Sequence, residues 1–224
     1  MISVVIPVRN AEKTVENSIR SVLDQEIEDV EIICIVNGCI DNTRSVIERM
    51  NDSRIRLSES SPGIVPALNE GLRMSRGEFI ARQDADDTWL PGKLGAQIDY
   101  LSKNKEVDIL GTQMDVVDSH SNHLNYTNYP THSEDIVKSL LSANNPIGHS
   151  SVVFRRRILD KCAGYFDLFP IAEDMDLWTR CIPWYKMSNL KEVYVKYVHT
   201  HNPKYDPRVP QILSSWYRKL YGLK

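Results

Sequence analysis

Two apolar runs lie near the start of the chain, at residues 2–8 (ISVVIPV) and 31–36 (EIICIV). Runs of this kind are typical of strands that are buried on both faces, as in a parallel sheet covered by helices. Between them, Val15, Ile19 and Val22 recur at helical spacing. The pattern therefore predicts that the chain begins with a strand, a helix and a second strand.

The alternation of helix and strand continues along the chain. In the first half we expect a helix at 41–50, a strand at 55–57, a helix at 66–74 and a strand at 78–83. In the second half we expect a helix from residue 91, a strand at 107–117, a loop or hairpin at 119–129, a helix at 133–141, a strand at 150–154 and a helix within 171–182. Because no linker separates the halves, both are expected to belong to one doubly wound α/β sheet.

Composition excludes several classes of protein. The 224 residues carry a net charge of −3, without the basic surplus of a nucleic-acid binder. No apolar stretch approaches the about 20 residues that a membrane span needs. The N-terminal run has no basic leader, and the four cysteines have no CxxC spacing, so reduced core thiols are favoured over disulfides or zinc ligands. We therefore expect a soluble cytoplasmic protein.

Polar clusters follow three of the predicted strands. They are residues 7–10 (PVRN), Asn37-Gly38, and the acidic stretch 84–87 (DADD). Ligands of open α/β sheets bind outside the carboxyl ends of the strands, so these clusters are expected to line one pocket. One Asp is explained as a turn or capping residue before the helix at Pro91, but three within four residues are not. Hard cations such as Mg²⁺ and Mn²⁺ prefer carboxylate oxygens, which favours a metal site.

The chain resembles a family 2 glycosyltransferase with the GT-A fold. The resemblance rests on five segments that occur in the family's order between residues 2 and 182: ISVVIPVRNAEKTVENSIRSVLDQ, EIICIVNGCIDNT, SPGIVPALNEGLRMSRGEFIARQDADD, HSSVVFRRRILDKCAGYF and AEDMDLWTRC. It implies a mostly parallel central sheet flanked by helices, with a small acceptor-side region. Residues 1–200 would form one domain, with a nucleotide-sugar-binding half at 1–103 and an acceptor-side half at 104–200.

The resemblance also assigns a donor site for a nucleoside-diphosphate sugar. Asp86, the last residue of the family's DxD motif, would be the main ligand of Mn²⁺ or Mg²⁺. Asp84 would contact the metal or the ribose, and Asp87 would support the site or start the next helix. The further donor-binding positions are Pro7, Arg9, Asn10, Asn37 and Asn69.

Two donor positions depart from the family's pattern. Asn37 stands where the family has an Asp that pairs with uracil, and Arg9 stands where it has a Tyr. An Asn amide can both accept and donate hydrogen bonds, and a guanidinium can stack on a base. UDP is therefore the favoured nucleotide, with GDP and dTDP left open.

Glu173 and Asp174 open the last predicted helix of the domain. Alone they would be interpreted as acids at a helix N-terminus. In the resembled family, Asp174 matches the catalytic base of the ED motif, which implies an inverting single displacement onto a hydroxyl of a glycan or lipid-linked acceptor. Glu173 and Asp176 would orient the base or bind acceptor. His149 and Trp178 are the other candidate acceptor contacts.

The tail, residues 201–224, contains five Lys or Arg and one acid, and its apolar residues recur at helical spacing. The pattern predicts an amphipathic helix that packs on the domain or lies on a membrane surface. Of two late histidines, His199 and His201, either could match the family's His near the diphosphate, although a solvated His is the simpler interpretation.

Two other functions are compatible with such a sheet. A sugar nucleotidyltransferase would normally carry a Gly-rich loop after the first strand, whereas residues 7–11 (PVRNA) contain no Gly. A non-catalytic sugar-nucleotide-binding protein is suggested by Val36-Asn37, but the intact acidic motifs argue against it.

Overall fold

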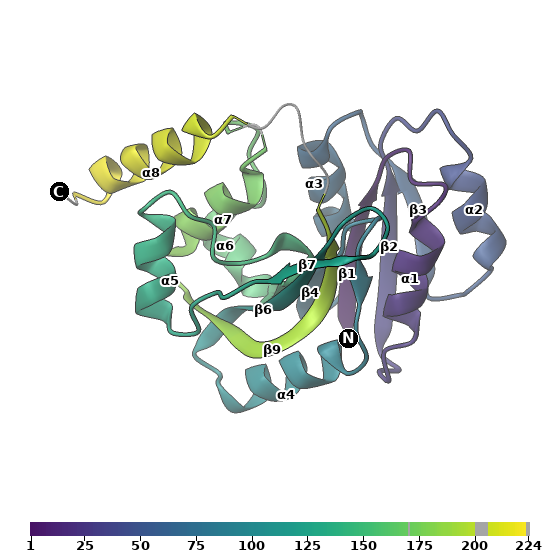
Figure 1. The fold of residues 1–224 in the computed structure, drawn as a ribbon, viewed down its shortest axis with the longest axis horizontal. Helices are drawn as coiled ribbons and strands as arrows, with labels where there is room; N and C mark the ends of the chain where they lie inside the picture. Colours follow the sequence, from purple (N-terminus) through teal and green to yellow (C-terminus); the bar gives the residue numbers. More distant parts are fainter. Residues whose placement is uncertain (170, 200–205, 223–224) are drawn as a thin grey trace.

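One sheet runs through the computed structural model, which describes residues 1–169, 171–199 and 206–222 (Figure 1). Within these residues the strand order is β3-β2-β1-β4-β8-β6-β9-β5, and β7 pairs with β6. The strands are β1 (Ile2–Val8), β2 (Val30–Val36), β3 (Ile55–Glu59), β4 (Phe79–Arg82), β5 (Thr88–Trp89), β6 (Val107–Val117), β7 (His123–Tyr126), β8 (Val153–Arg155) and β9 (Lys186–Val198). Strands β3, β2, β1 and β4 are parallel, as are β6 and β9, and β8 is antiparallel to both of its neighbours.

Helices cover both faces of the sheet in two layers. Alternate residues of β1 point to opposite faces, so Val4 and Ile6 pack with the helices of the first layer, whereas Val5 packs with those of the second. The first layer contains α1 (Val15–Leu23), α2 (Thr43–Met50) and α4 (Lys93–Lys103). The second contains α3 (Ile64–Met74), α5 (Ser133–Leu140), α6 (Leu159–Cys162), α7 (Glu173–Cys181) and α8 (Arg208–Leu220). The predicted α/β class with a mostly parallel sheet between helices is therefore confirmed.

Helix α3 lies very close to β1. A Cβ added at Gly71 would come within 2.2 Å of a methyl carbon of Val5, so only a glycine fits this contact. Pro66 is the third residue of α3 and lies in its first turn, where a missing N–H costs no helical hydrogen bond.

The structure departs from the predicted elements in the second half. The predicted strand at 150–154 is split into a 3₁₀ turn, η1 (His149–Ser151), and the short strand β8. A second 3₁₀ turn, η2 (Arg156–Ile158), follows β8. β5 was not predicted, because its two residues carry no periodic pattern. The loop or hairpin expected at 119–129 is a hairpin in which β7 pairs with β6.

Insertion of β8 between β4 and β6 has a consequence for function. It places η1 beside the carboxyl end of β4, where the acidic stretch begins. Strands β1 and β2 end in register, with Val8 opposite Val36, so their polar clusters meet at the same edge. The carboxyl ends of β1, β2 and β4 therefore line one hollow, and the segment before β8 lines part of an adjoining hollow.

Candidate active site

The hollow at the strand ends is a cavity of about 890 Å³, called here the strand-end cavity. This volume is in the range of small-molecule sites. Its lining includes five of the six predicted donor-binding residues: Pro7, Arg9, Asn10, Asn37 and Asp84. Asp86 and Glu173 also line it. Tertiary folding thus brings together side chains from positions 7 to 173.

A second hollow, the central cavity, has a volume of about 490 Å³ and contains Asp174. It shares four lining residues with the strand-end cavity: Ile64, Asp84, Ile171 and Glu173. The two cavities therefore adjoin along a common wall. Ile171 has a φ of 62°, a left-handed conformation that a β-branched residue rarely adopts, so the backbone beside this wall is strained.

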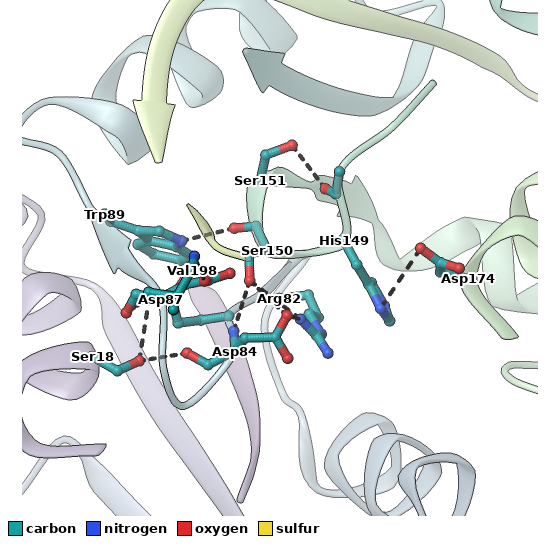
Figure 2. Close-up of polar contacts among 12 residues, drawn as sticks. Ser18, Arg82, Asp84, Asp87, Trp89, His149, Ser150, Ser151, Asp174 and Val198 are labelled. Carbon is teal, nitrogen blue, oxygen red and sulfur yellow. Dashed lines mark hydrogen bonds and ion pairs between the residues drawn. The ribbon is translucent and has the colours of Figure 1, made fainter. Parts of the chain in front are cut away.

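Asp84 is held by two neighbours (Figure 2). Its carboxylate forms an ion pair with Arg82 and accepts a hydrogen bond of 3.0 Å from the Ser150 hydroxyl. The Asp84 N–H in turn donates to Ser150 Oγ at 2.9 Å. Only 5% of the Arg82 side chain is exposed, and its Nε has no hydrogen-bond partner among the described residues. The carboxylate of Asp84 is therefore both oriented and charge-compensated by the protein itself.

Asp86 differs from Asp84 in having no such partner. It is exposed at the strand-end cavity, and no described side chain pairs with its carboxylate. Partial desolvation, followed by the charge of Asp84, raises the pKa of Asp86 to about 6. A cation close to this carboxylate would relieve both effects.

Asp87 is buried below the cavity. One of its oxygens accepts a hydrogen bond of 2.8 Å from the N–H of Val198, whereas Oδ2 has no partner among the described residues. Burial and the neighbouring charges of Asp84 and Asp86 raise its pKa well above the usual range. Asp87 thus ties the acidic stretch to the end of β9.

The donor set fits a hard divalent cation. The unpaired carboxylate of Asp86, with that of Asp84 beside it in the lining of the strand-end cavity, supplies oxygen ligands of the kind that Mg²⁺ and Mn²⁺ prefer. Among the described residues, however, no group of three or more His, Cys, Asp and Glu side chains is arranged to hold a metal. Such cations are commonly bound by one or two carboxylates plus phosphate oxygens of a substrate, and these side chains are compatible with that arrangement.

Asp174 lies at the N-terminal end of α7, in the wall of the central cavity. Its Oδ1 accepts a hydrogen bond of 2.7 Å from the N–H of Met175, and its Oδ2 accepts one of 2.8 Å from Asn145 Nδ2. The Nδ1 of His149 is 4.0 Å from Oδ2 (Figure 2). Burial raises the pKa of Asp174, and these N–H donors and the charge of Arg82 oppose that rise. A carboxylate whose pKa is raised is a better proton acceptor than a fully solvated one.

Glu173 and His149 complete the environment of Asp174. Desolvation, followed by the charge of Asp174, raises the pKa of Glu173 to about 7. Burial and the nearby Arg82 lower the pKa of His149 well below its usual value, so the imidazole is neutral. Its Nε2 lies 2.9 Å from the hydroxyl oxygen of Tyr165, which fixes the orientation of the ring.

We expect Asn145→Ala to shift the pH dependence of the site. Loss of the amide N–H removes a donor that stabilises ionised Asp174, so the pKa of Asp174 should rise further. Activity that requires the ionised base should then be lost at a higher pH as the solution is acidified. Carboxyl NMR titration of Asp174 measures the shift directly. Asn125→Ala is the matched control, since Asn125 is an exposed amide on β7 that donates to the carbonyl of Tyr126 instead. An equal shift in both variants would contradict the assignment.

Two predicted acceptor contacts are corrected by the structure. Asp176 and Trp178 are both 0% exposed and therefore cannot touch a ligand in this conformation. Asp176 accepts hydrogen bonds from Arg180 Nε at 2.9 Å and from the Tyr217 hydroxyl at 2.7 Å, which ties α7 to α8. The reason for the error is that α7 is buried on nearly all sides, so that every residue from Met175 to Thr179 is buried.

Asn69 does not face the donor site either. Its amide donates to the carbonyl of Tyr165 at 2.9 Å and accepts from the Tyr165 N–H at 3.0 Å, so both polar atoms bind one backbone residue. It joins α3 to the turn after α6. His199 lies just past β9 and does not line the strand-end cavity, and His201 lies outside the described residues.

Several site residues were not assigned from the sequence. Arg82, Ser150 and Asn145 hold the two carboxylates, and Lys196 of β9 lines the strand-end cavity. Arg82 and Ser150 fall inside segments that carry the family resemblance, which was the available signal. The hydrogen bond between Ser150 and Asp84 joins positions 66 residues apart, and no local sequence pattern reports such a contact.

Comparison with known proteins identifies relatives of this chain. The O-antigen biosynthesis glycosyltransferase WbnJ of Escherichia coli is 30% identical over 90% of this chain and 80% of its own length. The UDP-Glc:alpha-D-GlcNAc-diphosphoundecaprenol beta-1,3-glucosyltransferase WfgD of Escherichia coli is 31% identical over 80% of this chain and 68% of its own length. An uncharacterized Haemophilus influenzae glycosyltransferase is 29% identical over 88% of this chain, which covers only 65% of that relative.

Solved structures share the fold. TarS of S. aureus superposes with a TM-score of 0.74 at 19% identity, covering 88% of this chain and 60% of that one. The mannosyltransferase PcManGT of Pyrobaculum calidifontis, in complex with GDP-Man and Mn²⁺, gives a TM-score of 0.66 at 18% identity over 91% of this chain and 57% of that one. The family model for glycosyl transferase family 2 matches residues 3–162. The predicted resemblance is thereby confirmed, and the chain belongs to glycosyl transferase family 2.

Proposed function

We propose that this protein transfers a sugar from a nucleoside-diphosphate sugar to a hydroxyl group of a glycan or lipid-linked acceptor, with inversion at the anomeric carbon. One observation carries the proposal. Asp86 and Asp174 line two adjoining cavities whose common wall includes Asp84 and Glu173. A donor and an acceptor bound in the two cavities would meet at this wall. Asp86 on one side is suited to bind a cation, and Asp174 on the other is suited to accept a proton.

The strand-end cavity would hold the nucleotide. Asn37 lies at the carboxyl end of β2, and Pro7 lies near that of β1. A nucleotide in the cavity can bring its base and ribose into contact with the amide of Asn37 and the ring of Pro7. The diphosphate would lie near Asp86, with Asp84 facing the ribose or sugar. A divalent cation held by Asp86 would supply positive charge to the departing diphosphate.

The central cavity would hold the attacking hydroxyl. Asp174 accepts its proton while the oxygen forms a bond to the anomeric carbon. The bond between that carbon and the diphosphate oxygen breaks, and its electron pair leaves with the nucleoside diphosphate. Because attack and departure occur on opposite faces, one displacement inverts the configuration. The hydrogen bonds from Asn145 and from the N–H of Met175 keep the base oriented during the transfer.

UDP is the proposed nucleotide, and the relatives support a nucleotide-sugar donor. The structure of TarS with UDP-GlcNAc gives a TM-score of 0.71 to this chain, whereas PcManGT holds GDP-Man. Calorimetry with UDP, GDP and dTDP, each with and without Mn²⁺ or Mg²⁺, tests both the nucleotide and the metal. We expect UDP to bind most tightly of the three, and more tightly with metal than without it. Binding of no nucleoside diphosphate under any condition would refute the proposed function.

The O-antigen biosynthesis relative WbnJ supports a role in polysaccharide biosynthesis. No described helix is both long enough and apolar enough to cross a bilayer. We propose that the protein acts on the cytoplasmic side and contacts the membrane surface through α8. The helix packs on the domain through Leu213 and Tyr217, while Ile212, Trp216 and Leu220 on another face are 59%, 47% and 62% exposed. Basic residues flank this exposed stripe at 208, 218 and 219.

Replacing Ile212, Trp216 and Leu220 together with Ser should weaken membrane binding. Apolar side chains beside basic residues gain free energy when they enter the headgroup region of an anionic bilayer. Co-sedimentation with vesicles containing phosphatidylserine measures the bound fraction. Since Leu213 and Tyr217 are retained, the packing of α8 should persist. Equal sedimentation of the variant and the parent protein would rule out this contact.

A further inference from the structure

A third hollow, the outer cavity, continues the path away from the strand ends. It has a volume of about 540 Å³ and shares Tyr129, Asn145, Ile171 and Asp174 with the central cavity. The strand-end, central and outer cavities therefore form a series, with Asp174 facing both of the last two. A molecule that places a hydroxyl beside Asp174 can extend into the outer cavity.

The lining of the outer cavity has a distinct chemistry. Its polar side chains include the amides of Asn128, Asn144 and Asn145, and Tyr129 supplies an aromatic wall. Among the described residues that line it, none is Lys, Arg or His, and the only ionisable acid is Asp174. Amides both donate to and accept from hydroxyl groups, whereas phosphates and carboxylates are normally held by cationic donors. The lining therefore suits a neutral polyhydroxylated ring.

The walls of the outer cavity are fixed by the surrounding sheet. Asn189 of β9 donates to the carbonyl of Pro130 at 2.7 Å and to that of Pro146 at 3.0 Å, so one amide joins two lining segments. Gln113 of β6 binds the Tyr129 backbone on both sides, accepting from its N–H at 2.8 Å and donating to its carbonyl at 3.0 Å. A site whose walls are already ordered loses little conformational entropy when a ligand binds.

We propose that the outer cavity is a second acceptor subsite, which binds a neutral sugar ring linked to the ring that carries the attacking hydroxyl. The proposal rests on the function proposed above, because it takes Asp174 as the point of transfer. It assigns the acceptor to a chemical class: a glycan with at least two uncharged rings at its growing end. Asn128 and Asn144 are the residues that recognise the second ring, and Tyr129 separates the two rings.

The test compares matched pairs of p-nitrophenyl glycosides, a monosaccharide and the disaccharide with the same terminal sugar, built from glucose, galactose, mannose and N-acetylglucosamine. Binding is followed by saturation-transfer NMR in the presence of UDP and Mn²⁺. At least one disaccharide should bind about tenfold more tightly than its monosaccharide, as expected from one or two additional hydrogen bonds. The double variant Asn128→Ala/Asn144→Ala should lose this advantage and keep the affinity for the monosaccharide.

Asn125→Ala is the matched control, because Asn125 is an exposed amide on β7 that does not line the outer cavity. It should behave as the parent protein does. The subsite is refuted if no disaccharide exceeds its monosaccharide, if the double variant retains the advantage, or if a disaccharide with a uronic acid in the second ring binds more tightly than its neutral counterpart. Any of these results obtained with intact nucleotide binding would leave the proposed transferase activity standing.

Discussion

Asp174→Asn is expected to lower sugar transfer by about 10²–10⁴-fold, the usual contribution of a positioned general base. The amide has the size and shape of the carboxylate but cannot take the proton of the attacking hydroxyl. The change should not unfold the protein, because Asp174 is a partly buried acid whose pKa is raised, and a neutral side chain avoids the cost of desolvating that charge. Nucleotide affinity should stay the same, since we propose that the nucleotide binds in the strand-end cavity, which Asp174 does not line.

The measurement combines transfer rates with calorimetric binding of UDP in the presence of metal. Asp160→Asn provides the control, because Asp160 is an exposed acid on α6 that lines none of the three cavities. A second readout is the titration of Glu173, whose pKa is raised in part by Asp174 and should therefore fall in the variant. If Asp174→Asn retained full transfer, the base would have to be another residue.

Asp86→Asn is expected to remove the metal-dependent part of nucleotide binding. A bound cation contributes several kcal/mol of charge stabilisation to a diphosphate, and about 1.4 kcal/mol corresponds to a tenfold change in affinity. Affinity for UDP with Mn²⁺ should thus fall by about 100-fold, whereas the weaker binding without metal should not change. Calorimetry at fixed Mn²⁺ measures both, with Asp99→Asn on the exposed face of α4 as the control. If Mn²⁺ still increased the affinity for UDP to the same extent in Asp86→Asn, the metal ligand would have to be another residue.

Asp84 should respond differently from Asp86, although the two are separated by one residue. Asp84 is the ion-pair partner of Arg82, whose side chain is only 5% exposed. Removing one member of a buried pair leaves an uncompensated charge and costs about 3–5 kcal/mol. Asp84→Ala should therefore lower the free energy of unfolding measured with denaturant, and Asp86→Asn should leave it nearly unchanged. Equal free energies of unfolding for the two variants would show that the charge of Arg82 does not need Asp84 for its compensation.

Much of the α/β architecture was predictable because it follows from local patterns. The strand at 107–117 has the predicted bounds, and the strand at 2–8 is buried along its whole length, as its continuous apolar run predicted. The helix expected at 133–141 ends one residue earlier in the structure. Periodicity and turn residues report whether a segment faces a core on one side or both, and that information is contained within each segment.

The errors have a common physical cause. The segment at 150–154 has the composition of a strand, but Ser150 is drawn into hydrogen bonds with Asp84 and Trp89, and the backbone forms a turn there. Asp176 looked like an acceptor contact, yet its partners Arg180 and Tyr217 take it into the core. In each case, a contact between distant parts of the chain decided the conformation or the exposure.

The sequence by itself determined the α/β class, the family, and the location of the polar clusters at the carboxyl ends of β1, β2 and β4. Only the tertiary structure decided which charges are compensated and which are left for a ligand. Asp84 is paired with Arg82 and Asp86 is not, and Asn145 holds Asp174. The physical reason is that β8 inserts between β4 and β6 and carries residues 145–151 against the strand ends, a pairing set by the packing of the whole sheet.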